Sequence, residues 1–327
     1  MFRRILVPLD GSQHAERALP IAARIAHGAN ATLVLCRVVG RPSALALYET
    51  ARPTSSPGTA LLHEQARAYL ATVAGSPIVA GLRTETLALE GLVAEEILSV
   101  ISRSVLDLVV ICSHGHTEPT RWLLGSIAEK VARLSEAPVL VLREQNISEL
   151  ERVTEQNDPQ HPLQVLVPLD GSPLAESALQ PTVDLAAALT RQGHTALHLL
   201  SVLPPSGETD ETPSAEAGAG TNTAREELTQ QVSAYLERVG ARFQQHAPRQ
   251  DQQAFSSSVM FDTDAATRIL RSSGQDVDGA VATGMPGKCH MIAMTTHGSG
   301  GKRPWSIGTV ANRVLYATEL PMLLVRP

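Results

Sequence analysis

The sequence predicts an α/β fold with two similar domains in one chain, each a five-stranded parallel sheet flanked by helices. Two observations carry this prediction. Short apolar runs rich in Val, Leu and Ile alternate with segments of helical periodicity, which is typical of right-handed βαβ units. The segment Val165–Ser172 (Val-Leu-Val-Pro-Leu-Asp-Gly-Ser) also repeats Ile5–Ser12 at all but its first position, and both continue into Ala-Glu-x-Ala-Leu. A length of 327 residues suits two domains of ordinary size.

The first half contains the elements of one such domain. An apolar run from Arg4 predicts a buried strand that ends in the polar turn Asp10-Gly-Ser12, with Ser12 capping the next helix. That helix is expected over 14–27, where Ala and Leu recur at helical spacing, and it should end near Gly28. The other expected elements are a strand over 32–38, a loop over 40–58, a helix over 59–72, weak strand signals over 77–80 and 83–89, a helix over 93–102, a strand from 109 and a closing strand over 139–142.

The second half repeats this order after a polar segment with several helix breakers. We therefore predict a first domain over 1–145, a linker over 146–161 and a second domain over 162–327. The second copy is the longer one, and its additional residues are expected in three places. These are a mobile Pro/Gly/Ser/Thr/Glu tract over 204–223, a long helix over 224–245 and a glycine-rich segment over 275–287.

One glycine motif follows an apolar strand in both halves. In the first half Gly115 ends the strand, nine residues follow, and Gly125 then opens a helical pattern; Gly298 and Gly308 repeat this spacing. Glycine lets the backbone turn sharply, with positive φ, and approach a ligand closely. Free N–H groups at the start of a helix attract anions. The repeated motif therefore predicts a phosphate site.

The position of this site follows from the expected sheet. In doubly wound sheets, ligands bind beyond the carboxyl ends of the strands where the strand order reverses. The polar or Gly-rich strand ends of the first half are Asp10–Ser12 and Cys112–Gly115, so these two loops are expected to face one another.

Composition excludes several classes of function. The net charge of −6 and an aromatic content of 3% argue against nucleic-acid binding. The sequence has no apolar run of about 18 residues and no signal-peptide core, so we expect a cytoplasmic protein that does not enter a membrane. Its three cysteines lack paired spacing and are expected to be reduced.

The Val-Pro-Leu-Asp-Gly-Ser opening, the Gly-x9-Gly-[Ser/Thr] motif and the closing Ala-Pro-Val-Leu-Val-Leu strand resemble the universal stress protein family in its tandem two-domain form. The resemblance covers nearly the whole chain except 146–161 and 204–223. It implies Rossmann-like domains of the HUP, or adenine nucleotide alpha hydrolase-like, type. The closing strands 139–142 and 322–325 are apolar edges without lysine or proline. The resemblance implies that they pair antiparallel in an intramolecular pseudo-dimer, with further association into a homo-oligomer left open.

The resemblance further implies ATP or another adenine nucleotide, with or without Mg²⁺, in the cleft between the first and fourth strands. Asp10 and Asp170 would lie at the adenosine end, and the backbone of Val38 and Val202 would contact the adenine edge. The full set implied in the first copy is Pro8, Leu9, Asp10, Val38, Ile111, Cys112, His114, Gly115, Gly125, Ser126 and Ile127. The set implied in the second copy is Asp170, Val202, Thr295, His297, Gly298, Gly308, Thr309 and Val310, with His114 and His297 along the phosphate path.

The chain departs from the family motif Gly-x2-Gly-x9-Gly-[Ser/Thr] at its first glycine, which is replaced by Cys112 and Thr295. If that position needs positive φ, either replacement costs about 1–2 kcal/mol or blocks the ligand. If it merely ends the strand, nothing is lost. The first copy is favoured, because cysteine is smaller at the β-carbon than threonine.

Less specific interpretations stay open. Asp10-Gly-Ser12 and its repeat could serve only as turns and helix caps. A metal site at Cys112, His114 and His116 is disfavoured because Gly115 interrupts the strand. Loop cations such as Arg121, Lys302 and Arg303 could screen phosphate or simply be solvated.

Two classes of function follow from the sequence. One is an ATP-binding regulatory protein of the stress response, and the alternative is a nucleotide-free scaffold that recruits protein partners. Beyond slow ATP hydrolysis at most, an enzyme is not expected, because the sequence has no nucleophile with a suitably spaced base and no Gly-x4-Gly-Lys-[Ser/Thr] loop.

Overall fold

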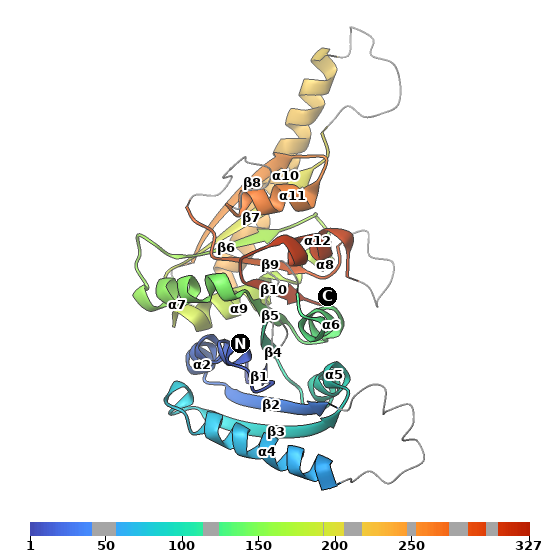
Figure 1. Cartoon of the computed structure of the whole chain (residues 1–327). Helices are drawn as coiled ribbons and strands as arrows, with labels where there is room; N and C mark the ends of the chain where they lie inside the picture. Colours follow the sequence, from blue (N-terminus) through green and yellow to red (C-terminus); the bar gives the residue numbers. More distant parts are fainter. Residues whose placement is uncertain are drawn as a thin grey trace, which may run out of the picture.

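One continuous sheet runs through the protein (Figure 1). The computed structural model describes residues 1–40, 57–113, 124–191, 193–205, 218–246, 253–274, 287–298 and 307–327. Within these residues ten strands lie in the order β3-β2-β1-β4-β5-β10-β9-β6-β7-β8. They are β1 (Arg4–Pro8), β2 (Thr32–Gly40), β3 (Arg83–Gly91), β4 (Leu108–Cys112), β5 (Val139–Leu142), β6 (Leu163–Pro168), β7 (Thr195–Leu203), β8 (Gln253–Phe261), β9 (Met291–Thr295) and β10 (Met322–Val325).

Each half of the sheet is parallel and five-stranded, which confirms the predicted fold class. The two halves meet where β5 pairs antiparallel with β10, with Leu140 opposite Leu323. The closing strands therefore have the predicted bounds, and they join the two halves within the chain. Strand order reverses between β1 and β4 in the first half and between β6 and β9 in the second.

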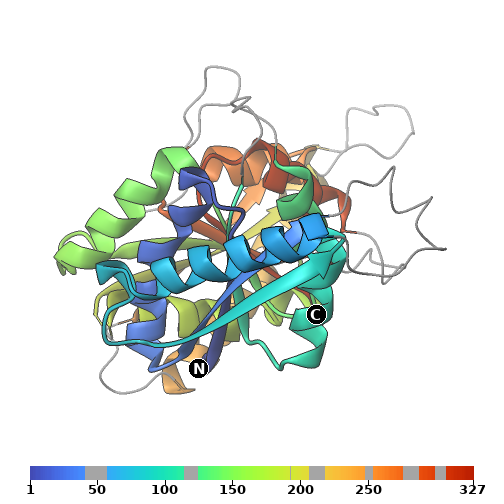
Figure 2. The ribbon, with the colours of Figure 1, turned by 60° about the horizontal axis from the view of Figure 1, so that its bottom comes forward.

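Helices cover both faces of the sheet and bury the strands on both sides. On β1, Ile5 and Val7 pack into one core while Leu6 packs into the other, so alternate residues serve opposite layers. The first layer contains α2 (Ala18–Ala29), α4 (Pro57–Ala74), α7 (Ile147–Gln156), α9 (Leu179–Thr190) and α10 (Gly218–His246). The second contains α5 (Val93–Arg103), α6 (Ser126–Leu134), α11 (Ala265–Ser272) and α12 (Thr309–Ala317). Figure 2 shows α4 lying along β3 at one edge of the sheet.

The helix after β1 begins as predicted but does not end at Gly28. Ser12 Oγ accepts the Ala15 N–H at 3.1 Å and caps α1 (Gln13–Glu16), and α2 then runs to Asn30, which ends it in the left-handed region with φ 52°. Gly28 lies inside α2 and faces α9. A β-carbon at Gly28 would lie 2.0 Å from the Ala188 carbonyl oxygen. Gly28 therefore permits a close helix crossing between the two halves, and the sequence-based assignment of a helix end was wrong.

The segment between the two halves is a packed helix. In α7, Ile147, Leu150 and Val153 are buried in the core that also contains α2 and α9. Arg24 of α2 donates to the Thr154 carbonyl at 3.2 Å and forms an ion pair with Glu155 at 3.1 Å. The sequence predicted a linker here, and its breakers lie only at the end of this helix. The domain boundaries at 145 and 162 stay a prediction.

Two arginines at the ends of the central strands link the halves reciprocally. Arg143, directly after β5, donates to the Leu315 carbonyl of α12. Arg326, directly after β10, donates to the Leu134 carbonyl of α6 at 3.1 Å. Each arginine thus binds the carboxyl end of a helix in the other half, where cations are favoured. Burial lowers the pKa of Arg143 to about 10, which leaves it charged at neutral pH.

Other sequence-based expectations need smaller corrections. The weak strand signal over 77–80 corresponds to a 3₁₀ helix, η1 (Pro77–Val79), and α10 begins at Gly218 rather than near 224. Of the tract expected to be mobile, 206–217 lie outside the described residues, as do 41–56 and 275–286. No helix in the described part of the chain is long and apolar enough to cross a membrane.

The crossing of α2 and α9 gives a first test. Gly28→Ala should lower the free energy of unfolding by about 1–3 kcal/mol, because the added methyl group meets backbone and the helices must move apart. Gly75→Ala is the matched control: its β-carbon would have no neighbour closer than 3.5 Å. Urea unfolding followed by circular dichroism measures both, and equal stabilities of the two variants would contradict the role of Gly28.

The pairing of β5 with β10 gives a second test. Combining Leu140→Pro with Leu323→Pro removes backbone donors in central strands and should separate the two halves. The radius of gyration from small-angle scattering should then increase, while Leu140→Val with Leu323→Val should leave it unchanged. An unchanged radius in the proline variant, with both halves still folded, would rule out this arrangement.

Candidate functional site

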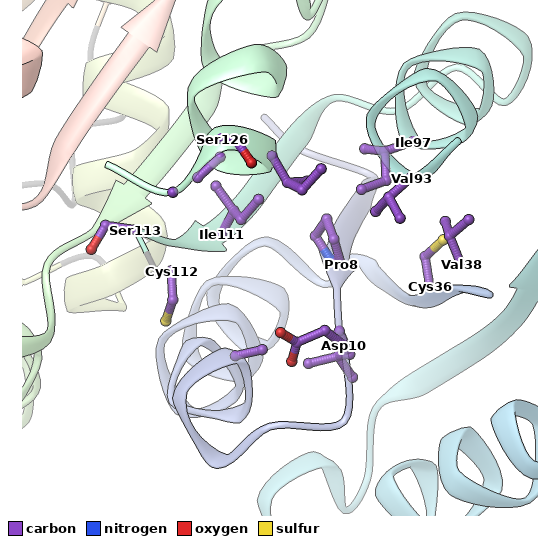
Figure 3. Close-up of a pocket in the computed structure, with 15 residues that line it drawn as sticks. Pro8, Asp10, Cys36, Val38, Val93, Ile97, Ile111, Cys112, Ser113 and Ser126 are labelled. Atoms are coloured by element: carbon purple, nitrogen blue, oxygen red, sulfur yellow. The ribbon is translucent and has the colours of Figure 1, made fainter. Parts of the chain in front are cut away.

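A cavity of about 250 Å³ opens at the carboxyl ends of β1 and β4 (Figure 3). This is the place where the strand order of the first half reverses, as expected for a ligand site in such a sheet. Nine residues implied by the sequence line it together. They are Pro8, Leu9, Asp10, Val38, Ile111, Cys112, Gly125, Ser126 and Ile127.

The cavity is chemically divided. Val38, Val93 and Ile97 form an apolar end, with Val93 and Ile97 one turn apart on the cavity face of α5. Asp10 and Ser126 lie toward the other end, near Cys112 and Ser113 (Figure 3). An apolar ring and a polar or anionic group could therefore bind side by side.

Asp10 forms the turn at the end of β1 and also lines the cavity. Its Oδ1 accepts the Ser12 N–H at 2.8 Å, and Gly11 between them has φ 88°, which glycine adopts most easily. The second copy repeats this turn, with Asp170 Oδ1 accepting the Ser172 N–H at 3.0 Å. The turn-and-cap interpretation is therefore correct for both copies, and the position of Asp10 in the cavity is an additional feature.

The start of α6 forms the polar end of the cavity. Gly125 has no side chain to cap the helix, and its own N–H donates to the Ser113 carbonyl at 2.7 Å. The N–H groups of the first turn have no partner within a helix, and Ser126, Ile127 and Ala128 of that turn line the cavity. The positive end of the helix dipole thus adjoins the cavity, which suits an anion.

Positive φ is not the reason for glycine at the helix starts. Gly125 has φ −59° and Gly308 has φ −62°, so this expectation was wrong. At Gly308 the constraint is space, since a β-carbon would lie 3.2 Å from the Thr296 carbonyl oxygen. Gly308 N–H donates to that oxygen at 2.7 Å, as Gly125 N–H does to the Ser113 carbonyl oxygen. Gly115 and His114 lie outside the described residues.

The thiols beside the cavity are not activated. Burial raises the pKa of Cys112 to about 12, with a smaller contribution from the Glu144 carboxylate. Burial likewise raises the pKa of Cys36 to about 12. Both are neutral near pH 7 and are therefore poor nucleophiles and poor metal ligands. Within the described residues, no group of three or more His, Cys, Asp or Glu side chains could hold a metal ion.

The second copy of the motif is packed differently. Thr295 Oγ1 donates to the His297 carbonyl at 2.6 Å, which ties the end of β9 to the following turn. A β-carbon at Gly298 would lie 2.1 Å from Asp170 Oδ2, so the two loops of the second copy are in close contact, the arrangement that the sequence predicts for the first copy. Burial lowers the pKa of His297, with a further contribution from Arg326. Of the remaining predicted residues, Val202 packs against the core, Thr309 begins α12, and Val310 is exposed.

Some cavity residues were missed by sequence reasoning. Val93 and Ile97 had a recognisable signal, because their spacing on the expected helix 93–102 places them on one face. Cys36 had a weaker one, being two residues before Val38 on the same face of β2. For Ala15, Ser113 and Ala128 the sequence offered no specific signal, since small residues line many kinds of contact.

Comparison with known proteins identifies relatives of both halves. The model of the universal stress protein family matches residues 1–143 and again 163–326. A universal stress protein of Methanocaldococcus jannaschii is 31% identical over 143 residues, which are 44% of this chain and 83% of that protein. One of Mycobacterium bovis is 26% identical over 221 residues, 67% of this chain and 62% of that protein.

A solved structure resembles the whole chain. The crystal structure of a universal stress protein from Archaeoglobus fulgidus covers 99% of this chain and 98% of its own, with a TM-score of 0.61 and 18% sequence identity. At this identity the likeness shows the fold, in agreement with the two parallel half-sheets described above.

The partly buried thiol of Cys112 gives a third test. Alkylation of Cys112 by iodoacetamide at pH 8 should be slow, since a pKa raised from 9.0 to about 12 lowers the thiolate fraction by roughly a thousandfold. The rate should rise about tenfold per pH unit above that. Peptide mass spectrometry locates the modified cysteine, and urea-unfolded protein is the control. Equal rates in the folded and unfolded protein would contradict the raised pKa.

Proposed function

This chain belongs to the universal stress protein family, and from this premise we propose that its first domain binds an adenine nucleotide, ATP or a related adenosine phosphate, between β1 and β4. The observation that carries the proposal is one cavity with an apolar wall at one end and the start of α6 at the other. Such a division suits a ligand that joins an aromatic base to phosphate.

The apolar end would hold the adenine ring. Val93 and Ile97 from α5 and Ile111 from β4 offer aliphatic contacts to its faces. Backbone polar groups near Val38 would bind its edge, which would make recognition of the base independent of any charged side chain. A volume of about 250 Å³ is small for a ligand site, so the phosphates would project from the cavity rather than fill it.

The polar end would hold the sugar and phosphates. Asp10 is positioned to accept a hydrogen bond from a ribose hydroxyl group. The first N–H groups of α6 and the Ser126 hydroxyl would bind phosphate oxygens, where the helix dipole adds to each hydrogen bond. Bound Mg²⁺ would be held mainly by the phosphates themselves, as this cation usually keeps several waters.

We place the nucleotide in the first copy rather than the second. Thr295 carries a branched β-carbon where the family motif has glycine, and Asp170 contacts Gly298 so closely that the ligand would have to displace it. Cys112, at the corresponding position of the first copy, is not branched at its β-carbon, and it lines an open cavity. The second domain would then act mainly through its contacts with the first.

The nucleotide would act as a conformational ligand in a cytoplasmic stress response rather than as a substrate. The cavity thiols are neutral and the Asp10 carboxylate accepts a hydrogen bond within its own turn, so neither is an activated nucleophile. One observation favours the alternative, a nucleotide-free scaffold: Cys112 has a side chain where nucleotide-binding relatives of this motif have glycine.

Nucleotide content decides between these alternatives. Denatured, purified protein should release about one adenine nucleotide per chain, detected by ion-pair chromatography with mass detection, or the empty protein should show a thermal shift with ATP and Mg²⁺. Gly125→Val should weaken binding at least tenfold, because its side chain enters the phosphate end. Gly308→Val makes the same change in the second copy and should leave affinity unchanged. No released nucleotide and no thermal shift would support the scaffold instead.

A further inference from the structure

An arginine, a glutamate and a histidine form a cluster near Cys112, at the polar end of the cavity. Arg17, which ends α1, forms an ion pair with Glu144, with Nη1 and Oε1 2.6 Å apart. His14 of α1 approaches the same carboxylate, with Nδ1 and Oε2 3.3 Å apart. Glu144 begins η2 (Glu144–Asn146), the short turn that follows β5 and leads into α7. The cluster therefore connects the first helix to the end of the central strand.

Strand register places this cluster close to Cys112, which lines the cavity. Cys112 at the end of β4 lies beside Leu142 of β5, and Ser113 N–H donates to the Leu142 carbonyl at 2.9 Å. Glu144 follows two residues later, and α1 packs against β4. The charges of Glu144 and Arg17 both influence the pKa of the Cys112 thiol, raising and lowering it respectively. Both charges thus lie within electrostatic reach of a cavity residue.

Arg17 can exchange its partner. Its side chain is 51% exposed and that of Glu144 34%, and exposed ion pairs of this kind contribute little to stability. A guanidinium group has five N–H donors in a planar fork that matches phosphate oxygens. A phosphate that reaches the cluster therefore offers Arg17 a stronger partner than Glu144, at little cost to the fold.

The second copy lacks this cluster although it keeps other polar contacts. The second copy is numbered 160 residues higher at α1 and 183 residues higher at the end of the closing strand. The residues that correspond to His14, Arg17 and Glu144 are therefore Leu174, Ser177 and Pro327. In contrast, the hydrogen bond from Tyr69 to Glu16, at 2.7 Å, recurs as Tyr235 to Glu176 at 3.1 Å. The ion pair of Lys130 with Glu95 likewise recurs as Arg313 with Asp264. Among the described residues, the cluster is therefore specific to the first copy, which contains the cavity described above.

We propose that Arg17 is a specificity residue of the first site. It is paired with Glu144 in the free protein and binds the phosphates of the ligand in the complex. The inference rests on the proposed function and adds a ligand preference to it. Phosphorylated adenosine is favoured over adenosine itself because Arg17 moves from the carboxylate to the phosphate. The negative charge of the Glu144 carboxylate repels phosphate, and this repulsion lowers the affinity of the site for ATP.

Calorimetric titration of the full chain with adenosine, AMP and ATP tests this proposal. Arg17→Gln should weaken ATP binding five- to twentyfold and leave adenosine within twofold, while Arg17→Lys should retain part of the preference. Glu144→Gln should strengthen ATP binding, because it removes a competing anion. Arg152→Gln is the matched control: its side chain is 52% exposed and is paired with Glu149 in α7. It should change none of the affinities.

The outcomes separate this inference from the proposed function. Wild-type protein that binds neither adenosine nor ATP would overturn both. Wild-type protein that binds ATP, with Arg17→Gln binding it equally well, would overturn the role of Arg17 alone. Equal losses for adenosine and ATP in Arg17→Gln would show a structural effect and also overturn it. If Arg17→Gln does not fold, Glu144→Gln decides, since unchanged or weaker ATP binding in that variant contradicts the proposal.

Discussion

The antiparallel pairing of β5 with β10 is the constraint on which the rest of the molecule depends. These short strands are buried on both faces and have neighbours on both edges, so neither half-sheet has an exposed edge at the centre of the molecule. Packing around them follows from this pairing. It brings α2 against α9 closely enough to require Gly28, and it places Arg143 and Arg326 at the helix ends of the opposite half. An open edge of four apolar residues would otherwise invite pairing with other chains.

The same pairing separates the two copies of the glycine motif. Because β5 and β10 run in opposite directions, the strands of one half-sheet point the opposite way to those of the other. The carboxyl ends of the two half-sheets therefore lie on opposite sides of the molecule along the strand direction. The two strand-end sites therefore cannot share a ligand, and each is free to diverge. Their divergence is visible at Cys112 and Thr295, and again at Arg17 and Ser177. A repeat that keeps its fold can thus keep one site and change the other.

The sequence predicted the strands well because burial on both faces leaves near-continuous apolar runs, and 139–142 and 322–325 appear with unchanged bounds. It failed where a residue's role depends on a distant partner. Gly28 was interpreted as a helix end because its contact with Ala188 is not visible in the sequence. Segment 147–156 was interpreted as a linker because most of its residues are polar, although its apolar face is buried against α2 and α9. At the site, strand ends indicated the cavity, and the spacing of Val93 and Ile97 placed both on one face of a helix. Only the packed structure shows that this face lines the cavity.

The helices that border the site also reach the junction between the halves. α6 begins at the cavity, is nine residues or about 13 Å long, and ends at Leu134, whose carbonyl accepts a hydrogen bond from Arg326 of the other half. Midway along it, Glu129 accepts a hydrogen bond from Tyr316 of α12. Glu144 is similarly paired with Arg17 and directly follows Arg143, which binds α12. Under the proposed function, a phosphate that pulls on α6 or on Arg17 therefore acts on groups already bonded across the junction. The second domain is thus placed to respond to a ligand bound in the first.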